Sequence, residues 1–516
     1  MKLNYKRTIC VGFAFFLICA FWQAYDNTVP LILTNKFGMS QAWSGVIMAL
    51  DNILALFLLP LFGAISDKHT GKRGRRTPFI LIGTLVAAIA FISLSLVDDA
   101  QLKNLDGAAA IDDPAGLRIV YQKEADRTLK TPDGETFVLE DTFTEDEFAA
   151  ITSQVTNAEG KTVTNHDYTN YVVPARQAYA HQTTLQHPGA LIGFIALLLV
   201  VLVAMATFRS PAVALMPDVT IKPLRSKANA VINLMGTGGG ILVLAIGMGF
   251  ATSSVRNSLM SYTAYFSVIA GLMVLALLIF RLTVNEPKFV AEMQADSKRF
   301  GIDNGDDGDT PAASGKLGKA ERRSLIFLLL SIVLWFFGYN AVTSAFSRYA
   351  EQELQGNFAL VLMICTVAAI VSYMPVGMIA QRIGRKRTIL IGIVMLGTAF
   401  FAGIFFHSVS PLLYIFFALA GMGWAFINVN SYPMVVELSK GSDVGKYTGY
   451  YYTVSMTAQI FTPILSNILM EHVGYRTLFP YAAFFVFASF VTMLFVRHGD
   501  ARPVAKKGLE ALDVDD

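Results

Sequence analysis

Two stretches of this chain resemble each other and define how the rest is organised. The first reads GAISDKHTGKRGRRTPFILIG at residues 63–83, and the second reads GMIAQRIGRKRTILIG at residues 377–392. Each places a Gly-Arg pair inside a basic run that leads directly into an apolar run. Aligning Gly74 with Gly384 gives an offset of 310 residues. This similarity predicts a chain built from two related halves.

A second pair of loops shows the same relationship at a different offset. Asp218 aligns with Glu437, and the basic residues that follow align as well, at an offset of 219 residues. The two offsets differ by 91 residues, which is the length of the segment 98–188. We infer that an insert of this length entered only the first half.

The apolar runs around these loops are long enough to cross a membrane. Of 516 residues, 54% are hydrophobic and only 15% are charged, whereas soluble domains carry about 25% charged residues. A transmembrane helix needs about 20 mostly apolar residues. Twelve runs satisfy this requirement, at residues 9–33, 43–66, 79–97, 189–216, 229–252, 260–283, 324–346, 357–380, 388–407, 411–434, 447–471 and 477–496. The first run is too long to be the apolar region of a signal peptide.

Basic loops predict how the chain is oriented in the membrane. Short loops rich in Lys and Arg stay in the cytoplasm, and the loops 67–78, 217–228 and 381–387 each hold at least three such residues. The short loops that alternate with these along the chain each hold at most one Lys or Arg. We therefore expect both termini in the cytoplasm, with Lys2 and Arg7 at the start of a bacterial inner-membrane protein.

Two longer segments interrupt the pattern of spans. Residues 98–188 carry β-prone runs between turn signals, and Thr144 with Glu147 forms a capping box, so we expect a small exoplasmic α+β insert. Residues 284–323 are polar and lack a periodic apolar pattern, which predicts a disordered cytoplasmic linker. The predicted divisions are an N-terminal six-helix half at 1–283, this linker, a C-terminal six-helix half at 324–498, and a tail at 499–516.

The loop at residues 63–76 resembles a family signature. A Gly, an Asp four residues later and a Gly-Arg-Arg cluster are similar to the second loop of the major facilitator superfamily. The run 77–83 and the stretch FRSPAVALMPDV at 208–219 resemble the sucrose-transporter branch, near the glycoside–pentoside–hexuronide:cation symporters. The resemblance implies an all-α membrane protein of twelve transmembrane helices in two six-helix halves, with the substrate bound between them. The branch's sugar-binding arginine would fall on Val213, and we expect Arg209, one turn earlier on the same face, to take its place.

The resemblance also implies a gate at this loop. Asp67 ends a helix that must separate from the other half, and it would form a charge latch with Arg75 and Arg76 near the N-terminus of a neighbouring helix. The second copy has Gln381 where the first has Asp67, so we expect a latch at Arg385 to be weaker or absent. Simple topological anchoring would also account for the arginines.

Two carboxylates lie inside predicted spans. Asp26 and Asp51 each lie about eight residues from the outer end of their span, which at 1.5 Å per residue is roughly 12 Å deep. Two carboxylates at one depth repel each other when both are ionised, which favours a bound proton. We expect them to carry the proton, although either could be a structural hydrogen-bonding group. A sodium site would need further oxygen ligands, and the positions that would supply them hold Ala55 and Leu59.

Other polar side chains inside the spans suit a sugar. Amides can donate and accept hydrogen bonds at once, and an indole can stack on the apolar face of a pyranose. The candidate ligands are Gln23 and Asn27, Asn340 and Ser344, and Trp424 and Asn428, each pair one helical turn apart. Hydrogen bonding between helices would also account for these residues.

We therefore expect a proton-coupled symporter that imports an α-glucoside such as sucrose or maltose. It would need no cofactor, bind no nucleic acid, contact membrane lipid and work as a monomer. An efflux antiporter for sugars or drugs remains open, as does a transporter-like sensor that uses the insert as receptor. The sequence holds no G-x-S-x-G, H-E-x-x-H or P-loop pattern, so we do not expect an enzyme.

Overall fold

The fold is taken from a computed structural model of the chain. It describes residues 2–132, 134–156, 160, 162–252, 254–302, 317–354, 358–439 and 443–500. The predicted tail beyond residue 500 lies outside these ranges.

Long helices form two groups of six along the chain. The first group is α1 (Tyr5–Asn35), α2 (Gln41–Lys68), α3 (Thr77–Asn104), α8 (Pro188–Asp218), α9 (Arg225–Gly249) and α10 (Thr263–Thr283). The second group is α12 (Lys319–Tyr349), α13 (Phe358–Ile383), α14 (Arg385–Gly403), α15 (Pro411–Glu437), α16 (Val444–Val473) and α17 (Leu478–Leu494).

Eleven of these helices, within the described ranges, are long and apolar enough to cross a membrane. The twelfth expected span, 447–471, falls in α16, which has 30 residues but is not among the eleven. Its first half is rich in Tyr, Thr and Ser, and this polar face lines the space between the two groups. The predicted all-α membrane architecture is confirmed, with little sheet.

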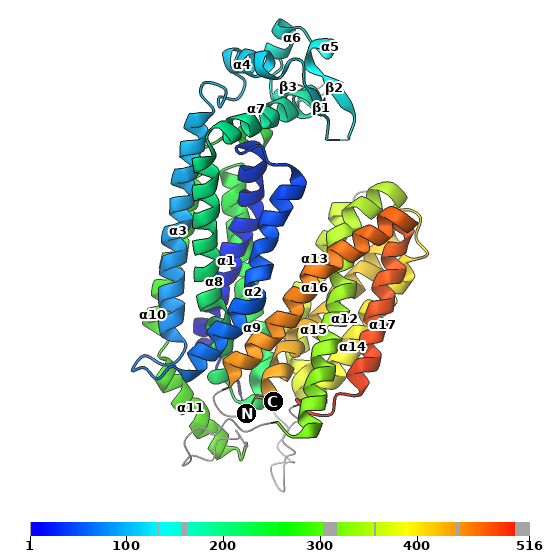
Figure 1. The fold of residues 1–516 in the computed structure, drawn as a ribbon. Coiled ribbons are helices and arrows are strands. Elements are labelled where there is room, and N and C mark those ends of the chain that lie inside the picture. The colour runs from blue at the N-terminus through cyan, green and yellow to red at the C-terminus, as the bar shows by residue number, and fades with distance from the viewer. Residues whose placement is uncertain are drawn as a thin grey trace.

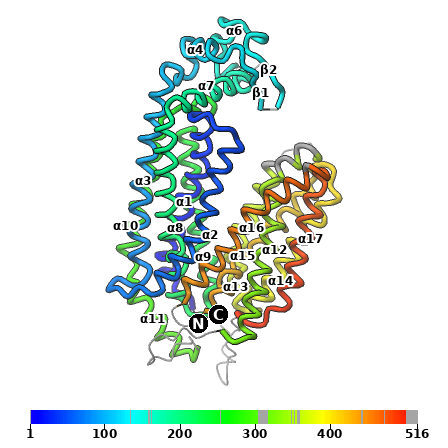
Figure 2. The backbone as a smooth tube through the Cα atoms, in the orientation of Figure 1, coloured from blue at the N-terminus to red at the C-terminus, as the bar shows by residue number. Residues whose placement is uncertain are grey.

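The two groups stand as separate bundles that meet at one end (Figures 1 and 2). We call this end, where both termini lie, the terminus side, and the opposite end, which carries residues 105–187, the insert side. On the terminus side α2 packs against α16, and α9 packs against α13. Gly63 lies against the carbonyl of Gly445, and Gly449 lies against Pro60. The missing side chains let the backbones touch, so the terminus side is closed.

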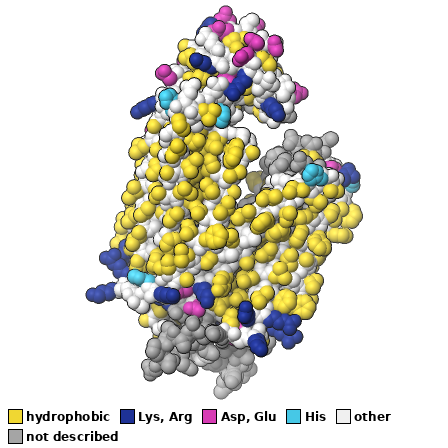
Figure 3. Space-filling model, in the orientation of Figure 1, with side chains coloured by type: hydrophobic (Ala, Val, Ile, Leu, Met, Phe, Trp, Pro, Cys, Tyr) yellow, Lys and Arg dark blue, Asp and Glu magenta, His cyan; other side chains and the backbone are white. Residues whose placement is uncertain are grey.

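Hydrophobic side chains cover the outer faces of both bundles (Figure 3). Lys and Arg gather near the terminus side of the same view, and charged side chains of both signs cover the insert. Apolar residues on these faces are largely exposed, for example Phe57 at 67% and Ile82 at 62%. This belt is what a bilayer requires of a spanning protein.

The insert is a small α+β unit with its own core. Its elements are α4 (Pro114–Glu124), α5 (Leu139–Thr142), α6 (Glu145–Ala149), α7 (Val173–Gln186), β1 (Thr128–Lys130), β2 (Thr136–Val138), β3 (Gln154–Thr156) and β4 (Thr162–Thr164). Two antiparallel hairpins, β1–β2 and β3–β4, flank α5 and α6. Leu117, Phe148 and Tyr168 are fully buried in the core. The predicted capping box of Thr144 and Glu147 is confirmed.

A buried ion pair lies where the insert joins the bundle. Lys36 Nζ donates to Asp98 Oδ2 at 2.5 Å and to the carbonyl of Met260 at 2.6 Å, and both charged side chains are fully buried. Burial lowers the pKa of Lys36, and the Asp98 carboxylate beside it opposes that effect. Gln101 donates to the carbonyl of Lys36 at 2.9 Å. These contacts belong to the bundle, although the insert was predicted to begin at residue 98.

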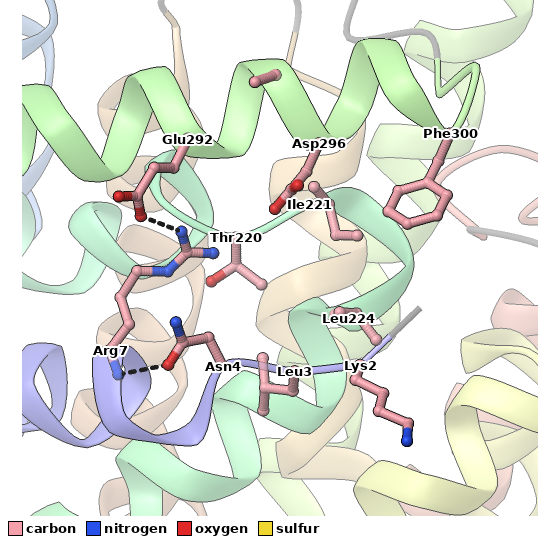
Figure 4. A pocket seen from close by; sticks show the side chains of 11 residues that line it. Lys2, Leu3, Asn4, Arg7, Thr220, Ile221, Leu224, Glu292, Asp296 and Phe300 are labelled. Carbon is pink, nitrogen blue, oxygen red and sulfur yellow. Dashed lines mark hydrogen bonds and ion pairs between the residues drawn. The ribbon is translucent and has the colours of Figure 1, made fainter.

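Part of the predicted linker is a helix. Residues 286–299 form α11 (Glu286–Arg299), capped by Asn285, so the expectation of a disordered tether is wrong for this part. The helix contacts the N-terminal segment, where Arg7 Nη1 donates to Glu292 at 3.3 Å beside a cavity of about 310 Å³ (Figure 4). The Asp- and Gly-rich stretch at 303–309 lies outside the described residues.

Candidate functional site

A large cavity opens between the two bundles above their point of contact. It has a volume of about 1160 Å³ and is lined by α1, α2, α8 and α16. Its hydrogen-bonding side chains are Trp22, Gln23, Asp26, Asp51, Asn52, Arg209, Gln459 and Asn467. Four of these carry a buried polar atom without a hydrogen-bond partner, namely Trp22 Nε1, Asp51 Oδ1, Arg209 Nε and Asn467 Oδ1. Two donors and two acceptors in the cavity wall therefore lack a hydrogen-bond partner in this conformation.

A smaller cavity of about 220 Å³ adjoins the large one. Its polar and aromatic lining includes Asn229, Asn233, Trp424, Asn428, Tyr451 and Ser455. Arg209, Met456 and Gln459 line both cavities. These three residues therefore lie at the boundary between the large cavity and the small one.

Arg209 is held by aromatic rings. Its guanidinium carbon lies 4.8 Å from the ring centre of Tyr452 and 5.4 Å from that of Trp22. Arg209 also forms a side-chain hydrogen bond with Tyr452, and the cation–π contacts fix the guanidinium while leaving its remaining N–H groups able to donate. The side chain thus presents a preoriented donor at the junction of the two cavities.

Both predicted carboxylates line the large cavity together with Arg209. Asp26 is exposed to the cavity, and Asp51 is half-buried. Asp26 interacts electrostatically with Asp51 and with Arg209. The two acids and the base therefore form one charge cluster on three helices. Across the described ranges, no three His, Cys, Asp or Glu side chains gather as a metal site would require.

The predicted sugar ligands separate into two groups. Gln23 lines the large cavity, and Trp424 and Asn428 line the small one. Asn27, Asn340 and Ser344 are absent from the described lining of both cavities. The Ser344 hydroxyl instead donates to the carbonyl of Ala341 at 3.4 Å. The α12 helix reaches the small cavity through Phe336, and Tyr339 of the same helix stacks on Trp424 with ring centres 3.7 Å apart.

Sequence reasoning missed several polar residues of the cavities. Asn229 and Asn233 lie one turn apart on α9, and Gln459 and Asn467 lie two turns apart on α16. Gln23 was selected because it lies one helical turn from another polar residue within a span, and the same criterion would have found Asn229 and Asn233. Asn229 also donates to the carbonyl of Val429 at 2.8 Å, which ties the two bundles together below the small cavity.

Asp67 joins the two bundles on the terminus side. Its Oδ1 accepts from the backbone N–H of Gly445 at 2.8 Å, and its Oδ2 accepts from that of Lys446 at 2.8 Å. Both donors belong to the first turn of α16. The unsatisfied N–H groups of a helix start favour a carboxylate at this place.

The same carboxylate is paired within its own bundle. Arg76, fully buried, donates through Nη2 to Asp67 at 2.5 Å and through Nε to Asp218 at 2.8 Å. Arg75 lies further from Asp218, at 3.7 Å. We call these contacts the Asp67 network.

The second copy of the loop also bridges the bundles. Arg385 donates through Nε to Ser226 Oγ at 3.0 Å and through Nη2 to the carbonyl of Lys222, both in the first bundle. Its Nη1 donates to Glu437 at 2.9 Å, and Glu437 also pairs with Arg225 across the interface at 3.4 Å. We call these contacts the Arg385 network.

A second latch is therefore present, and the alternative that it is absent is wrong. Gln381 does replace Asp67, but the contact between bundles no longer depends on a carboxylate at that position. In the Arg385 network the arginine itself crosses the interface, because a hydroxyl and a backbone carbonyl accept from it directly.

Two further carboxylates fix the arginine-bearing loops and were not predicted. Glu286 accepts from the backbone N–H groups of Arg75 at 2.7 Å and Thr77 at 2.8 Å, at the start of α3. Asp500 accepts from the N–H of Arg385 at 2.7 Å, at the start of α14. Gly74 and Gly384, with φ of +98° and +91°, give each carboxylate room to approach. Each acid follows the last span of its half, far in sequence from the loop that it caps.

Comparison with known proteins places the chain in a family. A model described as "MFS_1 like family" matches residues 21–401, and one described as "Major Facilitator Superfamily" matches residues 353–513. An uncharacterized MFS-type transporter of Schizosaccharomyces pombe is 27% identical over 176 residues, which cover 32% of this chain and 39% of the relative. The sucrose transport protein SUC3 of Arabidopsis thaliana is 42% identical over 70 residues, which cover 14% of this chain and 11% of the relative. The matches span less than half the length of these relatives.

Solved structures share the fold along nearly the whole chain. The MFS transporter FucP in the outward conformation has a TM-score of 0.56 at 12% identity, covering 96% of this chain and 99% of that one. The proton:xylose symporter XylE bound to 6-bromo-6-deoxy-D-glucose has a TM-score of 0.56 at 16% identity, covering 99% of both. Since the first family model spans well over half of the sequence, the chain belongs to the major facilitator superfamily, and the protein is a multi-pass membrane transporter and not an enzyme.

Proposed function

We propose that this transporter is a proton-coupled symporter for an α-glucoside such as sucrose or maltose. The observation that carries the proposal is the lining of the two joined cavities. Unpartnered donors and acceptors, amides and an indole lie together there with two carboxylates and an arginine. Sugar hydroxyls donate and accept at once, so they match a wall that offers both. The likeness to sucrose transport proteins over short segments supports the same substrate class.

The proposed cycle begins in the conformation described above. The sugar and a proton enter from the insert side, which we place outside a bacterial inner membrane, with both termini in the cytoplasm. Asp26 and Asp51 share the proton, because two ionised carboxylates in one cavity would repel each other. When the two acids are protonated, they no longer attract the guanidinium of Arg209. Its N–H groups then donate to the sugar. The Asp67 and Arg385 networks then part, and the terminus side opens.

The coupling energy is sufficient for accumulation. A potential of about 150 mV gives about 3.5 kcal/mol per proton, since each 100 mV is worth about 2.3 kcal/mol per charge. At 1.4 kcal/mol per tenfold, one proton per sugar supports a gradient of several hundred-fold. A single monomer with no cofactor is enough for this mechanism.

Counterflow in proteoliposomes tests the proposal. Vesicles loaded with unlabelled sucrose or maltose should take up the labelled sugar transiently, and an inward proton gradient should drive accumulation without preloading. Asn27→Ala is a matched control for Gln23→Ala, because Asn27 lies one turn away on α1 but is not part of the described cavity lining. Gln23→Ala should weaken sugar binding more than Asn27→Ala. Absence of counterflow with every disaccharide would refute the substrate class, and outward movement of sugar driven by inward protons would identify an antiporter.

A further inference from the structure

A groove on the lipid-facing side of the first bundle lies far from the transport path. It has a volume of about 350 Å³ and runs between α3 and α8. Its walls include Ile82, Val86, Val200 and Val203, of which Val200 is 46% exposed and Val203 40%. The bundle is covered by hydrophobic side chains on this flank (Figure 3). The groove is therefore open to the hydrocarbon of the membrane.

The groove exists because the two helices touch at a small residue. Gly83 lies against Phe208, and a Cβ on Gly83 would come within 2.7 Å of the Phe208 Cβ. The longer side chains on either side of this contact stand outward and leave a trough between them. Thr207 supplies the groove's one hydroxyl, and it already donates to the carbonyl of Val203 at 2.8 Å. Water would find no free partner here, so the fitting occupant is a hydrocarbon chain.

The depth of the groove indicates what is attached to that chain. Ile82 and Val86 lie five and nine residues after the start of α3 at Thr77. At 1.5 Å per residue this is about 8–14 Å below the end of the helix. A phospholipid whose acyl chain fills the groove therefore has its phosphate at the level of the preceding loop. Lys72 and Arg73 are exposed on that loop.

The charge of the loop that carries Lys72 and Arg73 favours one kind of lipid headgroup. Among the described residues, the acids Asp218 and Glu286 beside the start of α3 are buried and already accept from Arg76 and from the backbone there. The exposed charge beside the groove is therefore positive. From these observations we propose that the α3–α8 groove binds one acyl chain of an anionic phospholipid, with its phosphate held by Lys72 and Arg73.

Native mass spectrometry of the purified protein with phosphatidylglycerol and phosphatidylcholine tests this site. Val203→Phe fills the groove, and Val268→Phe makes the same change on α10, where Val268 is 44% exposed. The wild type and Val268→Phe should each retain one tightly bound phosphatidylglycerol that Val203→Phe loses. A thermal unfolding scan of both variants separates loss of the lipid from loss of the fold.

A second variant tests the headgroup contacts. Basic residues near an anionic surface contribute about 1 kcal/mol each, so Lys72→Gln with Arg73→Gln should reduce the preference for phosphatidylglycerol over phosphatidylcholine about 30-fold. Equal retention of phosphatidylglycerol by the wild type and Val203→Phe would overturn the groove as the site. An unchanged headgroup preference in the double variant would overturn the role of the loop. A wild-type dimer that Val203→Phe dissociates would assign the groove to a second copy of the chain and overturn the lipid.

Discussion

Replacing Asp67 with Asn should shift the protein away from the conformation described here. Asp67 accepts two backbone hydrogen bonds from the start of α16, and both cross between the bundles. An Asn side chain keeps one acceptor oxygen, but its NH₂ group faces the other N–H. Hydrogen bonds to charged groups contribute about 1.5–3 kcal/mol each. The ion pair of Asp67 with Arg76 lies within one bundle. Its loss destabilises both conformations equally and does not change the free-energy difference between them. The conformational equilibrium should therefore change roughly 10- to 150-fold.

Labelling of a cavity residue measures this shift. Ala49 lines the large cavity, so a single cysteine placed there, with Cys10, Cys19 and Cys365 replaced by Ser, is reachable only while the insert side is open. A membrane-impermeant thiol reagent added on the insert side should label Ala49→Cys more slowly when Asp67→Asn is also present, and transport turnover should fall.

The control for this experiment is the corresponding residue of the second copy. Gln381→Asn shortens a side chain that holds no charge and is absent from the described hydrogen bonds between the bundles, so labelling and turnover should stay at the wild-type level. If Asp67→Asn labels and transports like Gln381→Asn, the contact with α16 does not control opening, and the gating role of Asp67 is lost.

Three further variants test the transport cycle. Asp26→Asn should abolish proton-driven accumulation and retain sugar exchange, because Asn keeps the shape and hydrogen bonds of a protonated acid; accumulation against a gradient would move the proton to Asp51. Arg209→Lys should fail to restore sugar affinity in binding assays, since an ammonium lacks the planar set of donors held between two rings. Replacing residues 105–187 with a short Gly-Ser linker should leave uptake measurable, provided that the buried pair of Lys36 and Asp98 is kept; complete loss in a correctly inserted protein would show that the insert takes part in transport.

The apolar runs located all twelve long helices, with ends that differ from the observed ones by up to seven residues, because burial in lipid leaves a single strong signal. Each of the twelve expected runs coincides with a long helix, and the two loop offsets indicated an insert in the first half, although α3 includes the first seven residues of that predicted insert. The helix α11 was missed for the opposite reason. Its largely polar sequence has no long apolar run, and the contact of Arg7 with Glu292 joins segments that are far apart in the sequence.

The site was predictable only in part, because the sequence does not reveal which face of a helix turns to the cavity. Asp26, Asp51 and Arg209 were found because a charge within a span is costly to insert and faces the bundle interior or a water-filled cavity. Asn340 and Ser344 share a face of α12 as predicted, but only Phe336, one turn before Asn340 on that face, lies in the described lining of the small cavity. Gln459 and Asn467 lie on α16, whose many polar residues gave no reason to single out these two.

In the proposed cycle, Asp67 and Arg385 would each keep an ion-pair partner in their own bundle when the bundles separate. Opening removes the N–H groups of α16 from Asp67, but Arg76 and Asp218 stay with it in the first bundle. Opening removes Ser226 and the carbonyl of Lys222 from Arg385, but Glu437 stays with it in the second bundle.

An unpaired charge in a buried setting costs several kcal/mol, so a gate that broke its ion pairs would be locked shut. The interface that must open is instead carried mostly by hydrogen bonds to backbone groups and a hydroxyl, and these groups regain water when they part. The pair of Arg225 with Glu437 is the exception among the described contacts, because it crosses the interface. Glu437 keeps Arg385 when that pair breaks, so only Arg225 must find new partners, and the carbonyls of Pro217 and Thr220 already accept from it in its own bundle. Alternating access therefore exchanges protein hydrogen bonds for water at this end while each buried ion pair within a bundle is preserved.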